Sequence, residues 1–423
     1  MPCQGPSRLS ERSDYLPAKA IGIIPSFNFH GRLCEIREVR NRLQFSAALG
    51  LQANCPAVFS DEAIRQERDN WNREHDLTRS VAQIINDKEW QTMSASGTTW
   101  VIVLAAGDGR RLQCLTTNAS GMAVPKQFCS LCGGYSLLRD ALLRAEAVAL
   151  PEHICTIVAE QHRLWWGTAL GSIAKSNIIV QPRNRGTAHG ILLPLLHIMQ
   201  RDREARIVLL PSDHHVDNER ALATAMRRAI RQLNARSRQI FLLGISPERA
   251  DPDLGYIVPG DKVERNVSAV IRFVEKPSAT RAQRLIKGGA LWNAFIVAAR
   301  ASALLELFQT RIPQIVDAMR AAVVHDQSNP NDSVATTDLY QHLSDIDFSK
   351  QVLEGAESML RVVPVPHCGW SDLGTPTRLA ETLQRLPPQR ELPQDPLNPL
   401  AGFLNLSLQH SRLQALGDTS ARK

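Results

Sequence analysis

The sequence lacks any long uninterrupted apolar run, and this already argues against one class of protein. Nothing in its 423 residues approaches the roughly eighteen consecutive apolar residues that a membrane span needs. The first thirty residues also lack the basic-then-apolar order of a secretory signal peptide. There is no dense basic block and no stretch of basic residues interleaved with aromatics, so we expect neither a membrane nor a nucleic acid as partner.

A disulfide framework is missing as well. The eight cysteines are scattered over the whole length, so we expect a reducing, cytoplasmic setting. The formal net charge of +7 is spread thinly along the chain. Such mild basicity suits small anionic substrates. The sequence does not indicate the oligomeric state, and a homo-oligomer is possible.

Three regions differ in pattern: residues 1–92, 93–386 and 387–423. The first has little regular alternation, and its best helix, from Ser60 towards Trp90, is polar on most of its surface, so we predict a largely disordered N-terminal extension. The last is Pro-rich (LPPQRELPQDPLNPL) and is predicted to be a loosely held tail.

The middle region alternates regularly between strand-like and helical patterns, which predicts an α/β fold with a mainly parallel sheet flanked by helices. Ligands in such folds lie beyond the carboxyl ends of the strands. The expected strands are 100–105, 154–158, 178–180, 206–210, 240–245, 269–274 and 294–299, and the expected helices are 136–148, 160–173, 187–200, 218–234, 278–287 and 300–322.

A small glycine-containing loop follows the first of these strands, in the stretch VIVLAAGDGRRL. It fails the P-loop pattern because Gly109 is followed by two arginines and a leucine, and it fails the dinucleotide fingerprint because Leu112 stands where the third glycine is needed. Small residues still let backbone N–H groups approach an anion, and Arg111 and Lys126 can add charge. The alternative is a tight turn with two solvated arginines.

Further motifs along the chain favour the interpretation of this loop as a phosphate-binding loop. They are PKQF (125–128), QPRNRGTA (181–188), LLPSDHHV (209–216), GYI (255–257), FVEKP (273–277), LWNAF (291–295), DIDFSKQVLE (345–354) and GWSDLGTP (369–376). In this order the chain resembles the sugar-nucleotide pyrophosphorylases over roughly residues 98–380, most closely the mannose-1-phosphate guanylyltransferases. The resemblance implies a Rossmann-like nucleotidyltransferase domain that joins GTP to mannose 1-phosphate, with release of pyrophosphate and with Mg²⁺ as cofactor.

The resemblance also assigns roles to individual residues. Arg111, Lys126 and Asp213 would be catalytic, and Asp213 and Asp372 would hold the metal. The nucleotide would contact Ala106, Gly107, Gly109, Arg185, Gly186 and Thr187, and the sugar phosphate would contact Gly255, Glu275, Lys276 and Asn293.

Some assigned residues have a simpler structural interpretation. Asp213 can instead cap the helix predicted at 218–234, and Asp372 can be a turn residue. Glu275 and Lys276 can form a surface ion pair of little consequence. Asp347 matches an acidic position of the family, but it can equally cap the next helix. The neighbouring histidines, 214 and 215, are expected to be polar lining of a phosphate pocket and not ligands of a transition metal.

The chain departs from the family pattern at four positions. Gly186 replaces an asparagine in the loop that contacts the base, which puts the preference for guanine in doubt. Ala106 stands where a glycine is usual, Arg110 where a small hydroxyl residue is usual, and Phe295 where a glycine is frequent. None of these removes a charge that the reaction needs.

Two competing functions follow. One is a pyrophosphorylase for another base or another sugar 1-phosphate; the other is a silent protein that binds nucleotide-sugars and regulates. The stretch from Met93 is how an enzyme of this family would be expected to open. Residues 1–92 are therefore predicted to be dispensable, either as a disordered extension or as an upstream stretch that is not natively translated, and a regulatory domain is the competing interpretation.

Overall fold

The computed structural model describes residues 98–118, 121–131, 135–171, 173–329 and 334–386, and Leu406. All of them belong to the second of the two units into which the chain divides, Met1–Leu77 and Thr78–Lys423. The predicted extension 1–92 lies outside the described residues. So does the predicted tail 387–423 apart from Leu406, which is buried and donates its amide N–H to the Ser130 carbonyl at 2.9 Å.

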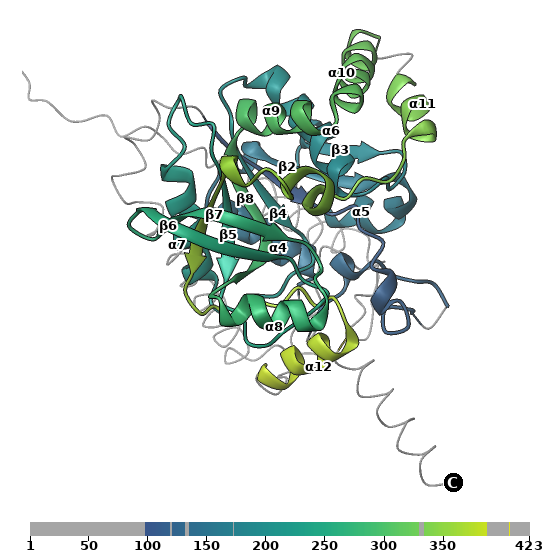
Figure 1. Ribbon diagram of the computed structural model, residues 1–423. Helices are drawn as coiled ribbons and strands as arrows, with labels where there is room; N and C mark the ends of the chain where they lie inside the picture. Colours follow the sequence, from purple (N-terminus) through teal and green to yellow (C-terminus); the bar gives the residue numbers. More distant parts are fainter. Residues whose placement is uncertain are drawn as a thin grey trace, which may run out of the picture. The chain divides into compact units, whose positions relative to one another are not determined.

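The centre of the described region is a nine-stranded sheet in the order β3-β2-β1-β4-β8-β5-β9-β7-β6 (Figure 1). Pairs β1–β2, β2–β3, β1–β4 and β5–β9 are parallel, and the other five pairings are antiparallel. The strands are β1 (Thr99–Leu104), β2 (Ile154–Ala159), β3 (Ile178–Gln181), β4 (Arg206–Pro211), β5 (Ile240–Ile245), β6 (Tyr256–Glu264), β7 (Val267–Val274), β8 (Leu291–Arg300) and β9 (Leu360–Val365).

Helices cover both faces of this sheet. None of them, within the described ranges, is long and apolar enough to cross a bilayer. They are α4 (Leu137–Glu146), α5 (Arg163–Ala169), α6 (Thr187–Arg201), α7 (Glu219–Arg231), α8 (Ala279–Lys287), α9 (Ala301–Arg311), α10 (Pro313–Ser328), α11 (Ala335–His342) and α12 (Pro376–Arg385), with a π-helical segment at Phe348–Leu353.

Alternation along the buried strands produces two cores. In β1, Val101 and Val103 point into the core shared with α4, α5 and α7, whereas Trp100 and Ile102 point into the core shared with α6, α9 and α10. Because both faces are covered, β1, β2 and β4 are apolar nearly throughout. The result is a three-layer α/β fold (Figure 1).

The predicted α/β fold with flanking helices is confirmed, its sheet is mixed, and the seven predicted strands are all present. Antiparallel pairing is more extensive than predicted, because β6, which was not predicted, forms a hairpin with β7, and β8 runs antiparallel between β4 and β5. The single helix predicted at 300–322 is wrong. It is two helices, because Ile312 leaves the helical conformation, with φ −143° and ψ 55°, and Pro313 then begins α10.

The sheet places the informative loops together. The carboxyl ends of β1, β2, β3 and β4 lie at one edge because these strands are parallel. The antiparallel β8 begins at the same edge, since Trp292 and Asn293 near its start pair with Ile245 and Gly244 at the carboxyl end of β5. The glycine loop, the 182–187 loop and Asp213 therefore face Asn293, as the sequence predicts for a ligand site.

Candidate active site

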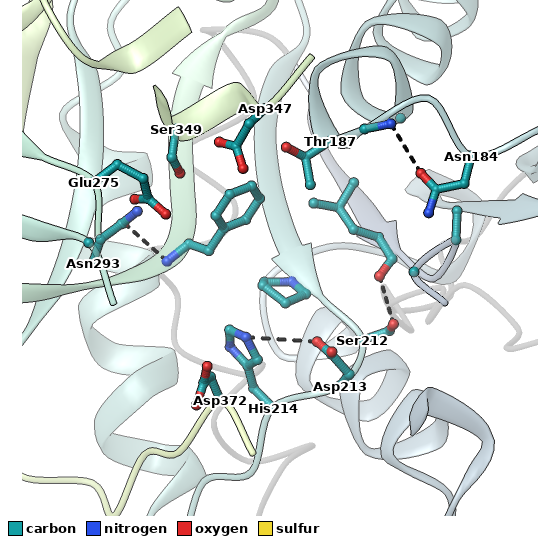
Figure 2. Close-up of a pocket in the computed structure, with 18 of the residues that line it drawn as sticks. Asn184, Thr187, Ser212, Asp213, His214, Glu275, Asn293, Asp347, Ser349 and Asp372 are labelled. Carbon is teal, nitrogen blue, oxygen red and sulfur yellow. Dashed lines mark hydrogen bonds and ion pairs between the residues drawn. The ribbon is translucent and has the colours of Figure 1, made fainter. Parts of the chain in front are cut away.

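The loops at this edge surround a cavity of about 580 Å³, and a second cavity of about 430 Å³ adjoins it. The two share Arg111, Gly186 and Asp213 in their linings. Figure 2 shows Glu275 and Asn293 on one side, Asn184 and Thr187 on the other, and Asp213 below. Of the predicted site residues, those that line the first cavity are Ala106, Gly107, Arg111, Gly186, Thr187, Asp213, Gly255, Glu275, Lys276, Asn293 and Asp372; Gly109 and Lys126 line the second.

The glycine loop rests directly on the PKQF segment. Gly109 has a φ of 63°, and a Cβ there would lie 3.1 Å from the backbone nitrogen of Lys126. Both the left-handed conformation and the close packing of the two backbones therefore favour glycine. The buried Gln127 amide donates to the carbonyls of Ala105 and Gly107 at 2.9 and 3.0 Å. These contacts fix the loop and the lysine as one unit.

The two arginines of this loop differ. The Arg110 side chain is 83% exposed and pairs with Asp108 at 3.1 Å, so the solvated interpretation holds for it. Arg111 lines both cavities, and its one ion pair within the described ranges is a long contact of 3.6 Å with Asp253. Such a weakly held guanidinium can turn to a phosphate without losing a strong contact.

Lys126 and Asp213 form the central ion pair of the site. Their Nζ and Oδ2 atoms are 2.8 Å apart, and the lysine also donates to the Asp372 carbonyl at 2.6 Å. The lysine side chain is 6% exposed and the aspartate 36%. Burial disfavours the charged form of Asp213, yet Lys126 and then His214 hold the pKa of its carboxyl below the usual value. Asp213 does not cap the following helix, because Asn218 does so.

His214 is a neutral donor beside this pair. Burial lowers its pKa to about 4, although Asp213 and Asp372 act in the opposite direction. The Trp370 indole N–H donates to its Nδ1 at 3.2 Å, so the proton lies on Nε2, which is 3.8 Å from Asp213 Oδ1. His214 lines the cavity as expected, whereas His215 pairs with Asp217 at 2.7 Å.

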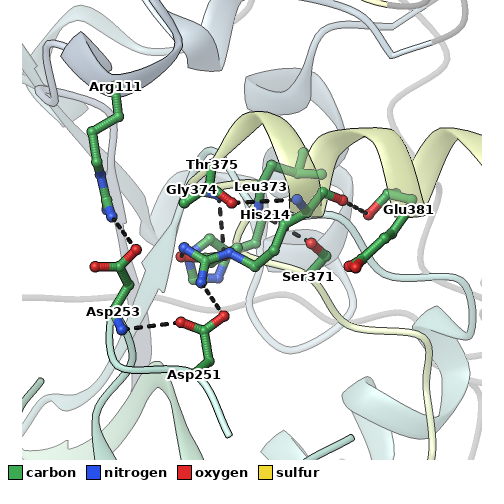
Figure 3. A network of polar contacts seen from close by, with 12 residues as sticks. Arg111, His214, Asp251, Asp253, Ser371, Leu373, Gly374, Thr375 and Glu381 are labelled. Atoms are coloured by element: carbon green, nitrogen blue, oxygen red, sulfur yellow. Dashed lines mark hydrogen bonds and ion pairs between the residues drawn. The ribbon is translucent and has the colours of Figure 1, made fainter. Parts of the chain in front are cut away.

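Asp372 is held by a buried arginine. Its carboxylate contacts Arg378 Nε at 2.7 Å and accepts the Gly374 N–H at 3.1 Å, so the turn interpretation also holds. Arg378 reaches on to Asp251 at 2.5 Å, and Asp251 accepts the N–H of Asp253 at 3.0 Å. Figure 3 shows Asp251 and Asp253 lying between this network and Arg111. A continuous set of contacts therefore joins Asp372 to the loop that precedes Gly255.

The predicted sugar end is compact. A Cβ on Gly255 would lie 2.5 Å from Glu275 Oε2, so glycine is required by the approach of that carboxylate. Lys276 donates to Glu275 at 2.6 Å; the glutamate is 9% exposed and the lysine 48%. Burial raises the pKa of Glu275, and Lys276 opposes this. Because both side chains line the cavity, they are more than a surface ion pair.

The predicted base loop is only partly confirmed as part of the site lining. Gly186 has a φ of 86°, and a Cβ there would collide with the Ile346 carbonyl. Arg185 lines neither cavity; its guanidinium donates to the carbonyls of Tyr340 and Gln341 at 3.1 and 3.2 Å. Asp347 caps the π-helical segment by accepting the Lys350 N–H at 3.0 Å, and it also lines the cavity. Both interpretations of Asp347 therefore hold.

Several lining residues were not predicted. Gln127, Gln181, Asn184 and Trp370 lie inside motifs that carried the resemblance, so the signal was present but was assigned to their neighbours. Gln181 is buried, and its Oε1 has no hydrogen-bond partner within the described part of the chain. Arg378 had no signal, because it acts through an aspartate 127 residues away.

The donor set can accept a hard cation. Within the described ranges, no group of three or more His, Cys, Asp or Glu side chains is arranged to hold a metal. Mg²⁺ commonly needs only one or two carboxylates together with substrate phosphates. Asp213 offers an ionised carboxylate at both cavities, and Asp372 keeps lone-pair capacity beyond its contacts with Arg378 and Gly374. These residues fit magnesium, with Asp213 as the better placed ligand.

Comparisons with known proteins agree with this geometry. The family model described as "Nucleotidyl transferase" matches residues 100–387. The chain is 30% identical to "Xanthan biosynthesis protein XanB" of Xanthomonas campestris, over 67% of this chain and 59% of that protein. It is 30% identical to "Mannose-1-phosphate guanylyltransferase RfbM" of Salmonella typhimurium, over 65% and 56%. It thus spans less than two thirds of the length of these relatives.

Solved structures are also similar to this chain, and one of them shows the extent of the match. The crystal structure titled mannose-1-phosphate geranyltransferase, from Thermus thermophilus, superposes with a TM-score of 0.59 at 26% identity, covering 69% of this chain and 81% of that chain.

Proposed function

Since the chain belongs to the nucleotidyl transferase family, we propose that it transfers a guanylyl group from GTP to mannose 1-phosphate, giving GDP-mannose and pyrophosphate. The Salmonella relative, named mannose-1-phosphate guanylyltransferase, supports this choice of base and sugar. The observation that carries the proposal is the arrangement of one cavity with the glycine loop and Asp213 at one end and Glu275 and Lys276 at the other.

The proposed reaction needs no protein nucleophile. A phosphate oxygen of the sugar 1-phosphate attacks the α-phosphorus of the triphosphate, a new P–O bond forms, and the bond to the bridging oxygen breaks, so that pyrophosphate leaves with its electron pair. The attacking oxygen is already an anion, so no base has to remove a proton. Catalysis then depends on positioning and on positive charge around the phosphates.

The cationic side chains divide between the two substrates. Arg111, next to the glycine loop, would contact the outer phosphates of GTP, and Lys126 would lie near the reacting phosphates. Lys276, at the other end of the cavity, would hold the phosphate of the sugar. Glu275 and Asn293 would accept and donate hydrogen bonds to the sugar hydroxyls.

Asp213, with Asp372, would hold Mg²⁺ in the loaded enzyme. A bound magnesium ion would neutralise charge on the phosphates and help to align them. The Lys126 ammonium, 2.8 Å from the Asp213 carboxylate, favours the ionised form of that carboxylate, which the metal would need.

A related activity with another base is favoured by one observation. The space beside Gly186 is filled by the Ile346 carbonyl, so an asparagine side chain cannot occupy this position as it does in the family pattern. The unpartnered Gln181 Oε1 would accept an N–H of whichever base enters. We also infer a cytoplasmic location, since described cysteines such as Cys129 and Cys155 are free thiols.

The test is a pyrophosphate-release assay on the full chain with GTP, ATP, UTP, CTP and dTTP, each paired with mannose, glucose and galactose 1-phosphate. The expected result is fastest turnover with GTP and mannose 1-phosphate at millimolar Mg²⁺. A preference for another pair would change the substrate assignment. Binding of nucleotide-sugars without any turnover would instead identify a silent regulatory protein.

A further inference from the structure

Phe295 holds a backbone conformation that side chains rarely adopt. Its φ is 55°, in the left-handed region that glycine favours and that strains a bulky residue. The other non-glycine residues with positive φ, among those described, are Asn266, Lys276 and Leu373. Lys276 and Leu373 line the two cavities, whereas Asn266 lies in the turn between β6 and β7. Strain of this kind therefore gathers at the site.

A bulge in β8 places Phe295. From Asn293 to Val297, β8 advances four residues while the paired β5 advances two. The bulge is tied down by Asn293, whose Oδ1 accepts the Phe295 N–H at 3.1 Å and whose own N–H donates to the Gly255 carbonyl at 2.8 Å. The residues proposed to contact the sugar thus also fix the conformation of Phe295.

Phe295 lines the same cavity as Glu275 and Lys276. Its ring meets the ring of Phe348 edge to face, with centroids 6.1 Å apart and an interplanar angle of 68°. Phe348 is fully buried and packs in turn against Phe308 at 5.5 Å. The Phe295 ring is therefore backed by the core and cannot easily move aside.

We propose that Phe295 determines which sugar 1-phosphates enter: its ring limits the space beside the sugar and excludes those that carry an extra substituent, such as an acetamido or a second phosphate group. An apolar ring offers no partner for the hydrogen bonds that a polar substituent loses on entry. A glycine would satisfy the backbone without filling the cavity. The ring is retained at a strained position because it contacts the substrate. This inference rests on the proposed function.

The test compares Phe295→Gly with the wild-type full chain on matched sugars, each with the triphosphate that the wild type uses best. The sugars are glucose 1-phosphate, N-acetylglucosamine 1-phosphate and glucose 1,6-bisphosphate. In the variant, kcat/KM for at least one substituted sugar, relative to the parent sugar, should rise about tenfold or more. The KM for the triphosphate should stay within about twofold.

Two further variants control for folding and strain. Phe295→Asn introduces a residue that tolerates the left-handed region and has a shorter side chain, so this variant should also accept the substituted sugars. Asn266 also has a positive φ but lies outside the two cavities. Asn266→Gly should therefore leave unchanged the ratio of kcat/KM between a substituted sugar and the parent sugar.

Unchanged ratios in both Phe295 variants would overturn the proposal, as would an equal change in Asn266→Gly. A wild type without turnover for any substrate pair would reject the proposed function alone. Binding of the same sugar phosphates, measured by isothermal titration calorimetry, would then decide the role of Phe295. Tighter binding of a substituted sugar by the glycine variant supports that role, and equal binding refutes it.

Discussion

Replacing Asp213 by asparagine should separate catalysis from folding. The carboxylate is the partner of a nearly fully buried lysine, 2.8 Å away, and it is also the proposed magnesium ligand. Breaking a buried ion pair costs about 3–5 kcal/mol of unfolding free energy. We expect less here, about 1–2 kcal/mol, because Asp213 is 36% exposed and Lys126 keeps the Asp372 carbonyl at 2.6 Å. The folded state should therefore survive.

The rate should suffer more than the stability. Loss of one preorganised electrostatic contact to a transition state typically costs about 3–4 kcal/mol, which is roughly a hundredfold to a thousandfold in kcat. Pyrophosphate release measured across a magnesium titration would give both kcat and the magnesium concentration for half-maximal activity. For Asp213→Asn we expect a lower kcat and a higher magnesium requirement.

A matched variant distinguishes the two roles of Asp213. Lys126→Met removes the partner and leaves the carboxylate, so it should lower kcat with a smaller change in the magnesium requirement. If Asp213 were only the counter-ion of Lys126, the double variant would be no slower than Lys126→Met, and the magnesium requirement would not rise. Wild-type turnover of Asp213→Asn at limiting magnesium would refute the reasoning altogether.

Three further outcomes are expected. Arg111→Ala should raise the KM of the triphosphate and Lys276→Ala that of the sugar 1-phosphate, since they lie at different ends of the cavity; equal changes in both constants would contradict this division. Gly186→Ala should lower the melting temperature and weaken triphosphate binding, because its Cβ would collide with the Ile346 carbonyl, and calorimetry checks this. Burial raises the pKa of Asp140 to about 7, above its unfolded value, so its contribution to stability is full at acid pH and is lost as pH rises through 7. Asp140→Asn should therefore raise the unfolding free energy by about 3 kcal/mol more at pH 8 than at pH 5 in urea titrations.

Part of the fold was readable from the sequence because burial leaves a strong pattern. The strands β1, β4 and β5 are covered on both faces and consist almost entirely of apolar residues, so they were found within one residue at each end. Strand β6 was missed because Pro259, Gly260 and Asp261 interrupt it and much of it is exposed. It is held in the sheet by its partners β7 and β8, which is information from distant parts of the chain.

The site shows the same division. Residues that lie within a short motif, such as Lys126 and Asp213, were predicted from the motif itself, and the structure places both in the cavity linings. Arg378 was not found, since its buried position matters only once Asp251 and Asp372 have been brought to it. Arg185 was assigned to the nucleotide from its motif, whereas its guanidinium is taken by the carbonyls of Tyr340 and Gln341.

The contacts of Arg378 also connect the two ends of the cavity. This buried guanidinium holds Asp372, next to the Lys126–Asp213 pair, and Asp251, which positions the loop leading to Gly255 at the sugar end. A charged group this deeply buried is costly unless every partner stays in place. A displacement of Asp372 would therefore disturb the sugar loop as well, although that loop belongs to a different part of the sequence. The positions of the carboxylate proposed to bind the metal and of the backbone proposed to contact the sugar are thus coupled through one side chain.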